Sequence, residues 1–507
     1  MNNAARVPMT AGERVCEAQR QKDEAQRQKD EAQRRLRAQG FEDCGGIACL
    51  DEIPAAAGGK LCLGMECLDR GLWELAPAIG TLGRLGIHSC RMQTGWARTE
   101  REKGVYDFSE MDREVRLARE AGFAPWLSLS YGNPVYASGD PDSLRAGGIG
   151  HVPIETQEER AAWQQYVAET VRRYRGQVAR YEIWNEPDVT AFFPPKYGDW
   201  VKGYMELVRL TAPVIRENDP DAQIVACTGS ADGLEPLLRA GMGEWVDVYS
   251  FHNYKALPES QNAAFRETLR QLRDRYAPGL GLIRGEAGCP SYNAPTSIGA
   301  LHGMTTSETI QAKWAARHLI ADFADPAIRE TSYFHAYEFL HFSRQHHYYY
   351  GVLREDYSRK PAFETLQLLA HLFDGEAVYA PWRTLRFEPD TDNVTARVCS
   401  FERGGLPVLA YWQSEELRDD SEVVRVRAQA FPKAQWRRPV LLDTLTRRVY
   451  ALSADEHGVL EAPLTRYAMI LTEAEALAPF LDKETLDRLL RNARAEETEQ
   501  AAQYAEG

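Results

Sequence analysis

The sequence lacks the features expected of a membrane-embedded or disulfide-stabilised protein. No stretch approaches the run of about 20 apolar residues that a membrane-spanning helix needs. Residues 1–10 contain no apolar core of the length found in a secretion signal. The nine cysteines form an odd, scattered set without a CxxC spacing, which favours reduced thiols over a disulfide framework. We therefore expect a cytoplasmic protein that has no membrane partner.

The sequence also lacks an excess of positive charge. Its formal net charge is −14, so the phosphates of a nucleic acid or an anionic membrane would be repelled. Apolar residues make up 44% and charged residues 26% of the 507 residues, which is typical of a well-packed globular chain. This length suits two or three domains. We expect a neutral small-molecule ligand rather than a nucleic acid.

An N-terminal repeat precedes the mixed sequence of the remaining chain. Residues 17–37 read EAQRQKD, EAQRQKD and EAQRRLR, a period of seven in residues that favour helix. A coiled coil would place these residues along its seam: Val15, Ala18, Lys22, Ala25, Lys29, Ala32 and Leu36. Alanines and lysines bury little apolar area in such a seam. We predict that residues 1–40 form an exposed or frayed helical extension, and that deletion of residues 1–38 leaves turnover and melting temperature nearly unchanged. A weak oligomerisation helix, which would make the chain a homo-oligomer, is the second interpretation.

Short apolar runs alternate with longer amphipathic segments from about residue 60 to residue 374. The apolar runs are KLCLGMEC, IHSCRMQ, FAPWLSLSYG, VARYEIWNE, QIVACTGS, VDVYSFHNY, GLIRGEAG and TSYFHAYEF. Parallel strands that are covered on both faces are expected to be mostly apolar in this way. Eight strand–helix units in this length predict an α/β fold, a (β/α)8 TIM barrel, which we assign to residues 41–374.

The pattern changes again after residue 374. Runs such as TARVCSFE, PVLAYW and EVVRVRA are short and separated by turn sequences such as ERGG and DEHG. This pattern predicts an antiparallel β-sandwich over residues 375–472. Residues 473–507 are rich in alanine and glutamate, which predicts a C-terminal helical tail that frays at its end.

Two of the predicted barrel strands end in a carboxylate. In YEIWNEPD, residues 181–188, the apolar run stops at Asn185 and Glu186, and Pro187 cannot extend the strand. In GLIRGEAG, Glu286 stands at the end of the seventh strand. The carboxyl ends of barrel strands meet at one mouth, where the active sites of this fold lie. Two carboxylates across one mouth are typical of glycoside hydrolysis, with one as acid/base and the other as nucleophile or base. The alternative is that each glutamate is a solvated loop residue.

The same motifs resemble those of glycoside hydrolase clan A, the retaining (β/α)8 glycosidases, and in particular the β-xylosidase family 39. The motifs that carry the resemblance are WNEP at 184–187, IRGEAG at 283–288, GVYDFSEMD at 104–112 and YGVLREDYSRKPAF at 350–363. The resemblance implies that Glu186 is the acid/base and Glu286 the nucleophile. It also implies that Asn185 bonds the sugar 2-hydroxyl, an interaction that strengthens in the transition state.

Residues at the other strand ends are candidates for the rest of the site. Arg91 could hold Glu286 ionised and oriented, or form an ordinary ion pair at the rim. Tyr254 could donate a hydrogen bond to Glu286. His252 could bond Glu186 or sugar, unless it is a satisfied structural histidine, and Glu66 could bond a sugar hydroxyl. The candidate stacking platforms for a sugar ring, each explained equally well by core packing, are Trp96, Tyr131 and Tyr337.

The eighth strand departs from the resemblance. Related enzymes place a tryptophan there, whereas FHAYEF offers Tyr337 and Glu338, which leaves the substrate open. The next aromatic run, HHYYYG at 346–351, is expected to rebuild the pocket wall. A metal site is its rival interpretation, although adjacent histidines point apart and no acidic cluster is near. We expect Cys289 to be a packed thiol rather than a nucleophile.

Together these observations predict a retaining β-glycosidase that cleaves small glycosides or short oligosaccharides, with β-xylosidase activity as one candidate. Glu186 should have a raised pKa, because it must carry a proton while Glu286 does not. We expect no metal or cofactor, and a small carbohydrate as the partner. An endo-acting β-glycanase is the alternative within this class. A non-catalytic carbohydrate-binding or assembly protein is the alternative outside it.

Overall fold

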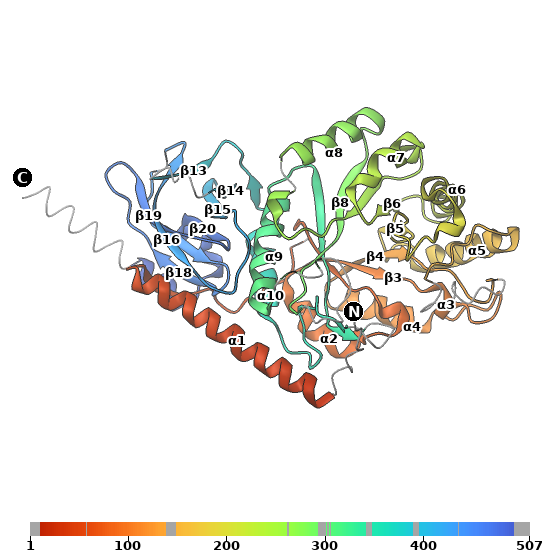
Figure 1. Cartoon of the computed structure of the whole chain (residues 1–507), viewed down its shortest axis with the longest axis horizontal. Helices are drawn as coiled ribbons and strands as arrows, with labels where there is room; N and C mark the ends of the chain where they lie inside the picture. Colours follow the sequence, from red (N-terminus) through yellow and green to blue (C-terminus); the bar gives the residue numbers. More distant parts are fainter. Residues whose placement is uncertain are drawn as a thin grey trace, which may run out of the picture.

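The chain folds into two β-structured bodies and one long helix (Figure 1). The computed structural model describes residues 11–56, 58–137, 149–260, 263–292, 301, 304, 306–340, 347–388, 395–433 and 435–490. A closed parallel barrel lies beside a β-sandwich, which confirms the predicted fold class. No helix in this described part of the chain combines the length and the apolar character that a membrane crossing requires.

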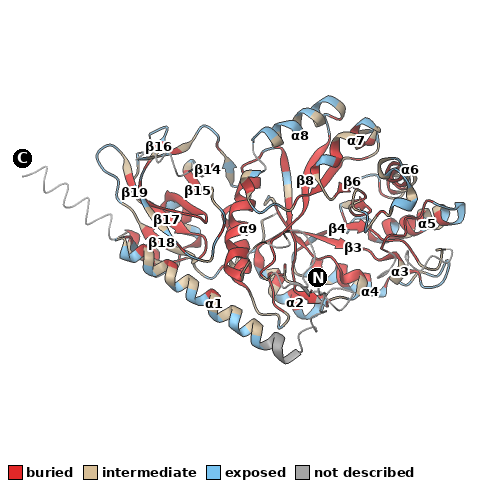
Figure 2. Cartoon of the chain, in the orientation of Figure 1, coloured by how far each residue is buried: buried red, intermediate tan, exposed pale blue. Residues whose placement is uncertain are grey.

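The barrel is a closed ring of parallel strands in sequence order. Its strands are β2 (Leu61–Gly64), β3 (Ser89–Gln93), β4 (Ala124–Leu129), β5 (Arg180–Ile183), β6 (Gln223–Thr228), β7 (Val248–His252), β8 (Gly281–Ala287) and β9 (Ile328–Tyr333). Its helices are α2 (Leu75–Leu82), the short α3 (Trp96–Thr99), α4 (Ser109–Glu120), α5 (Gln157–Tyr174), α6 (Trp200–Asn218), α7 (Leu234–Arg239), α8 (Ala263–Tyr276), α9 (Glu308–Phe323) and α10 (Pro361–Leu372). The strands are buried along nearly their whole length (Figure 2), because one face fills the barrel and the other packs under helices. This burial on both faces explains the uniformly apolar runs.

The second body is a β-sandwich of a 7-stranded and a 3-stranded antiparallel sheet. The larger sheet holds β12 (Ala377–Tyr379), β14 (Ala396–Arg403), β15 (Leu406–Gln413), β17 (Pro439–Asp443), β18 (Arg448–Ala451) and β20 (Met469–Glu473). The smaller sheet holds β13 (Thr384–Glu388), β16 (Val423–Phe431) and β19 (Val459–Thr465). After β20 the chain continues through α11 (Ala474–Leu477) into a helical segment over residues 483–490.

The seventh strand of the larger sheet comes from the start of the chain. It is β1 (Glu42–Gly46), which pairs antiparallel with β18. Residues 42–46 therefore belong to the sandwich, and the assignment of this segment to the barrel domain was wrong. The pattern failed because EDCGG has too few apolar residues to read as a strand, and the pairing that stabilises it lies some 400 residues away in the sequence.

Helix α1 (Ala11–Ala38) is docked on the protein, which contradicts the prediction of an exposed or frayed extension. It runs along α9 of the barrel, under both bodies in Figure 1. Its docking face is the same Ala- and Lys-containing seam that is too poor for a coiled coil. Ala25, Ala32 and Leu36 on this seam are buried, with Ala32 and Leu36 fully enclosed.

The lysines of the seam find acidic partners on the barrel. Lys22 pairs with Asp356 at 2.7 Å, and Lys29 pairs with Glu364 on α10. Just past the helix, the Gln39 side chain donates to a backbone carbonyl of β16 at 2.9 Å. The helix therefore contacts both bodies. The repeat does not reveal this docking, because its seam buries too little against a second copy of the helix, whereas its real partner is the chain's own charged surface.

Candidate active site

The turn after β5 presents Asn185 and Glu186 at the barrel mouth. The strand ends at Ile183, and the backbone then enters the left-handed region at Trp184 (φ 67°) and Glu186 (φ 44°). Such conformations cost free energy in residues with a Cβ, and they cluster at functional sites. The indole of Trp184 is buried and donates to the carbonyl of Phe192 at 3.1 Å, which holds the turn. The strained turn after this apolar strand thus places the Asn185 and Glu186 side chains at the barrel mouth.

Glycines allow β8 to bring Glu286 against β7. In this parallel pair His252 lies in register with Glu286. A Cβ on Gly285 would lie 1.9 Å from Ser250 Oγ, and a Cβ on Gly288 would lie 2.0 Å from the backbone carbonyl that follows β9. Both contacts are far inside van der Waals distance, so the glycines of IRGEAG are required by packing.

His252 joins the two carboxylates. Its Nδ1 lies 2.8 Å from Glu186 Oε1 and 2.7 Å from Glu286 Oε2. One carboxylate oxygen of Glu186 lies within 4.8 Å of one of Glu286. Because one nitrogen contacts both acids, a metal ion would have to displace these bonds to use the three groups as ligands. The arrangement therefore suits a shared proton or positive charge better than a metal centre.

Arg91 lies beneath the site and is fully buried. Its Nε donates to Glu182 Oε2 and its Nη1 to Glu66 Oε1, both at 2.8 Å. Its Nη2 donates to Asn185 Oδ1 at 2.9 Å. Its Nη1 is also 3.7 Å from Glu286 Oε1, an ion pair longer than a hydrogen bond. Arg91 therefore orients Asn185 directly and acts on Glu286 through its charge.

Neighbouring groups shift the pKa values of Glu186 and Glu286 in opposite directions. Burial raises the pKa of Glu186, and the hydrogen bond and charge of His252 offset this only in part. Burial also acts upward on Glu286, but the charges of His252 and Arg91 outweigh it and lower the pKa of Glu286. Burial disfavours the imidazolium, yet the two carboxylates raise the pKa of His252 to about 10. Of the two glutamates, Glu186 therefore holds the proton, and Glu286 is the one that stays ionised.

Glu66 is a third carboxylate at the mouth. Burial, opposed by Arg91 and reinforced by the charge of Glu286, raises the pKa of Glu66 to about 7. Its Oε1 accepts from Arg91, and its Oε2 is buried without a hydrogen-bond partner among the described residues. A sugar hydroxyl is one group that could satisfy this oxygen.

A cavity of about 550 Å³ opens above these groups. Its polar lining includes Glu66, Arg70, Gln93, Asn185, Glu186, Asn253 and Glu286. Its aromatic lining consists of Tyr131, Phe192, Tyr254, Phe334, Phe339 and Tyr350. A cavity of this size, with polar groups converging at one end and aromatic rings around them, suits a small polar ligand with apolar faces.

Two of the aromatic candidates line the cavity. Tyr131 stacks on Phe192 at 5.7 Å between ring centroids, and its hydroxyl accepts from Gln93 Nε2 at 3.0 Å. Tyr254 also borders the cavity, but within the described residues its hydroxyl is affected by the charge of Glu286 without a hydrogen bond to it. The suggested donation from Tyr254 to Glu286 is therefore not present in this structure.

The other two aromatic candidates are packing residues, so their assignment as sugar platforms was wrong. Trp96 is fully buried, stacks on Tyr136 and Tyr166, and does not border the cavity. Tyr337 stacks on Trp73 and Tyr357 and also lies off the cavity. Both follow a strand end closely, but the local backbone turns each ring back into the core, and sequence spacing does not reveal such a turn.

Three aromatic residues build the wall after β9. Phe334 follows the strand directly and Phe339 begins β10 (Phe339–Leu340), and neither was predicted from the sequence. Tyr350 belongs to the HHYYYG run, which was expected to rebuild the pocket wall, and it lines the cavity. The part of that run at residue 346, with its suggested metal site, lies outside the described residues. Glu182, inside β5, was also missed. The only available hint was an acidic residue within the predicted strand VARYEIWNE. Cys289 is buried, and burial raises its pKa, as expected of a packed thiol.

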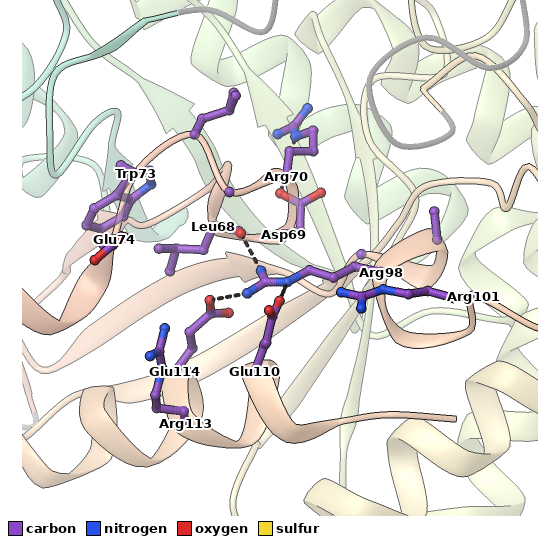
Figure 3. Close-up of a pocket in the computed structure, with 14 residues that line it drawn as sticks. Leu68, Asp69, Arg70, Trp73, Glu74, Arg98, Arg101, Glu110, Arg113 and Glu114 are labelled. Atoms are coloured by element: carbon purple, nitrogen blue, oxygen red, sulfur yellow. Dashed lines mark hydrogen bonds and ion pairs between the residues drawn. The ribbon is translucent and has the colours of Figure 1, made fainter. Parts of the chain in front are cut away.

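A second cleft of about 540 Å³ adjoins the first, and Arg70 and Leu72 line both. Figure 3 shows Arg98 at its centre, donating to the Leu68 carbonyl and to carboxylates from α4. The remaining charged residues that line it are Asp69, Glu74, Arg101, Glu110, Arg113 and Glu114. Side chains of both signs offer hydrogen-bond donors and acceptors close together. The cleft therefore suits a ligand with many hydroxyl groups better than a strongly charged ligand.

Comparisons with known proteins agree with this architecture. The family described as glycosyl hydrolases family 39 matches residues 84–414, more than half of the chain. No curated protein matches the sequence significantly. Among solved structures, a family 39 glycoside hydrolase from the gut symbiont Bacteroides cellulosilyticus WH2 is similar with a TM-score of 0.61 and 19% identity, over 82% of this chain and 80% of that one. A monomeric β-xylosidase from Caulobacter crescentus CB15 is similar with a TM-score of 0.55 and 15% identity, over 84% of this chain and 98% of that one.

Proposed function

The chain belongs to glycosyl hydrolase family 39, and we propose that it is a retaining β-glycosidase in which Glu286 is the nucleophile and Glu186 the acid/base. The observation that carries the proposal is the separation of the two acids, whose nearest ligand oxygens lie within 4.8 Å. Retaining enzymes hold their carboxyls about 5–5.5 Å apart, whereas inverting enzymes need about 6.5–9.5 Å to admit a water. The opposite pKa shifts of Glu186 and Glu286 support the same division of roles.

The proposed reaction has two steps. Glu286 attacks the anomeric carbon while Glu186 protonates the departing oxygen, which forms a covalent glycosyl-enzyme. Glu186 then takes a proton from water, and the hydroxide that develops releases the sugar with its original configuration. The charges of His252 and Arg91 keep Glu286 ionised before the attack. Asn185, held by Arg91, is proposed to bond the sugar 2-hydroxyl.

The proposed substrate is a short oligosaccharide or a small glycoside. A cavity of about 550 Å³ with an aromatic wall suits one sugar ring and part of a leaving group. A β-xyloside is one candidate, and a protein with a similar fold is a β-xylosidase. The adjoining cleft of about 540 Å³ favours an endo-acting glycanase as the second candidate, because further sugars could extend past Arg70. Product lengths from a labelled oligosaccharide ladder distinguish single-sugar release from internal cleavage.

Changing Glu186→Ala tests the roles of the acids. A dinitrophenyl glycoside needs little protonation, so its first step should survive and glycosyl-enzyme should accumulate. Azide can occupy the vacated space and attack without a base, so added azide should restore turnover and give a β-glycosyl azide. Glu286→Ala should lose activity on every substrate and give no such β-product.

The controls address stereochemistry and folding. Proton NMR of the first product from the unmodified enzyme should show retained configuration, and an inverted product would overturn the proposal. Tyr337→Phe changes a residue that does not line the cavity, so it is the matched variant and should keep its activity. Equal losses in Glu186→Ala on poor and activated leaving groups, without azide rescue, would contradict the acid/base assignment.

A further inference from the structure

A second cluster of a histidine and carboxylates lies at the start of α5, away from the two acids. His151, Glu155 and Glu159 each offer one ligand atom, and these atoms all lie within 4.8 Å of one another. His151 and Glu159 are both 1% exposed, whereas Glu155 is exposed to solvent. Among the described residues, only this cluster and the catalytic one bring three such groups together.

One carboxylate oxygen of Glu159 is buried without a hydrogen-bond partner. Its Oε2 accepts from the backbone N–H groups of Glu155 (3.1 Å) and Thr156 (2.9 Å), which closes the capping box of α5. Its Oε1 has no hydrogen bond within the described chain. It lies 3.5 Å from His151 Nε2, which is an ion pair when the imidazole is protonated but is longer than an ordinary hydrogen bond. A buried carboxylate oxygen is costly unless a further partner satisfies it.

We propose that His151, Glu155 and Glu159 bind a divalent transition-metal ion of the Zn²⁺ type. Two ligands that lie about 2.0–2.1 Å from a tetrahedral ion are separated by about 3.3–3.4 Å. The observed 3.5 Å between His151 Nε2 and Glu159 Oε1 meets this spacing almost without movement. An imidazole and carboxylates are ligands that Zn²⁺ accepts, and exposure of Glu155 leaves room for a water as the fourth ligand. Ca²⁺ is disfavoured because it requires about 6–8 oxygens.

The ion would join the first turn of α5 to a wall of the catalytic cavity. A Cβ on Gly132, just after β4, would lie 1.9 Å from the His151 carbonyl, so His151 is packed tightly on that strand end. Ile149, two residues earlier, lines the cavity. Lys196 Nζ lies 3.5 Å from Glu155 Oε2 and would compete with the ion for this carboxylate. Binding is therefore expected to stiffen the wall without contacting either acid.

Zn²⁺ alone, titrated into the tag-free full chain against a chromophoric chelator, tests the proposal. The exposed thiols Cys16 and Cys49 are first replaced by serine, because thiolates also bind Zn²⁺. We expect one ion per chain. Co²⁺ in place of Zn²⁺ should give the visible absorption of a four-coordinate site with nitrogen and oxygen ligands, without the charge-transfer band of a thiolate.

Glu159→Gln is the most informative variant, because glutamine keeps the capping box while the negative charge is lost. We expect its Zn²⁺ affinity to fall by about 100-fold or more, since loss of even an outer-shell partner costs about 10–100-fold. His151→Asn should lose affinity similarly. Lys196→Met should bind Zn²⁺ more tightly, because the competing ammonium is gone. Glu286→Gln is the matched control at the catalytic cluster and should bind as the unmodified chain does.

Three outcomes would overturn the proposal. The first is that the Cys16/Cys49-substituted chain binds no stoichiometric Zn²⁺. The second is a folded Glu159→Gln, judged by circular dichroism, with unchanged affinity. The third is loss of the ion in Glu286→Gln, which would assign it to the catalytic cluster. Should Glu159→Gln fail to fold, the Zn²⁺ affinity of Lys196→Met decides. A higher affinity supports the proposal, and an unchanged affinity overturns it, because an ion bound elsewhere would not respond to the Lys196 charge.

Discussion

Leu36→Ala should weaken the docking of helix α1 far more than loss of its ion pairs does. Leu36 is fully buried at 0% exposure. Truncating a buried leucine to alanine removes apolar contact and leaves a cavity, at a cost of about 2–5 kcal/mol. The side chains of the ion pair between Lys22 and Asp356 are 28% and 54% exposed, and such surface pairs contribute about 0–1 kcal/mol. The apolar contact, although made by few residues, is therefore expected to dominate.

Hydrogen exchange of the amides in residues 17–38, followed by mass spectrometry, measures this docking directly. Every 1.4 kcal/mol is a factor of ten in an equilibrium, so a loss of about 3 kcal/mol should speed exchange about 100-fold. Lys22→Ala should speed it by about fivefold at most. Gln26→Ala is the control, because Gln26 is exposed and, among the described residues, its side chain hydrogen-bonds Asp30 of the same helix and no other element. The reasoning is refuted if α1 of the unmodified chain exchanges like an isolated helix, or if Leu36→Ala and Gln26→Ala behave alike.

Two further predictions concern the site. His252→Asn removes a positive charge that lowers the pKa of Glu286, so the acid limb of the kcat/KM–pH profile should move to higher pH by about 1–3 units; an unmoved limb in a folded variant would contradict the proposed electrostatics. Gly285→Ala places a Cβ 1.9 Å from Ser250 Oγ and should cost about 1–3 kcal/mol of stability with much of the activity. Adding Ser250→Gly removes the 1.9 Å contact and should recover part of both losses, because the added Cβ still lies 3.2 Å from His252 Nε2. Gly279→Ala, which meets nothing within 4 Å, should be neutral.

Local patterns determined the architecture and the positions of the two acids. Continuous apolar runs alternating with amphipathic segments allow few solutions besides parallel strands covered by helices. A proline after Asn185 and Glu186 ends a strand wherever that strand lies. Because the carboxyl ends of all barrel strands meet at one mouth, the ends of β5 and β8 could be assigned to the same site without any tertiary information.

Only the tertiary structure decided which neighbouring side chains serve the site. Trp96 and Tyr337 follow strand ends within a few residues, as Tyr131 does, yet their rings pack into the core. Glu182 contacts Arg91 because β3 and β5 both lie beside β4 in the barrel, which brings together two side chains that are 91 residues apart in the sequence. Side-chain direction at a strand end depends on one or two backbone torsions, such as the left-handed φ at Glu186, and these are set by the surrounding packing.

The N-terminal helix shows the same division. Its seven-residue repeat predicts that the segment is helical and that Ala25, Ala32 and Leu36 lie on one face of the helix. The repeat alone could not identify the partner of that face. Its three apolar residues and two lysines bury too little area to hold a second copy of the helix. The same face does dock on a surface that offers Asp356 and Glu364 to the lysines. Secondary structure follows from neighbours in the sequence, whereas docking depends on complementary groups that the fold brings together from more than 300 residues away.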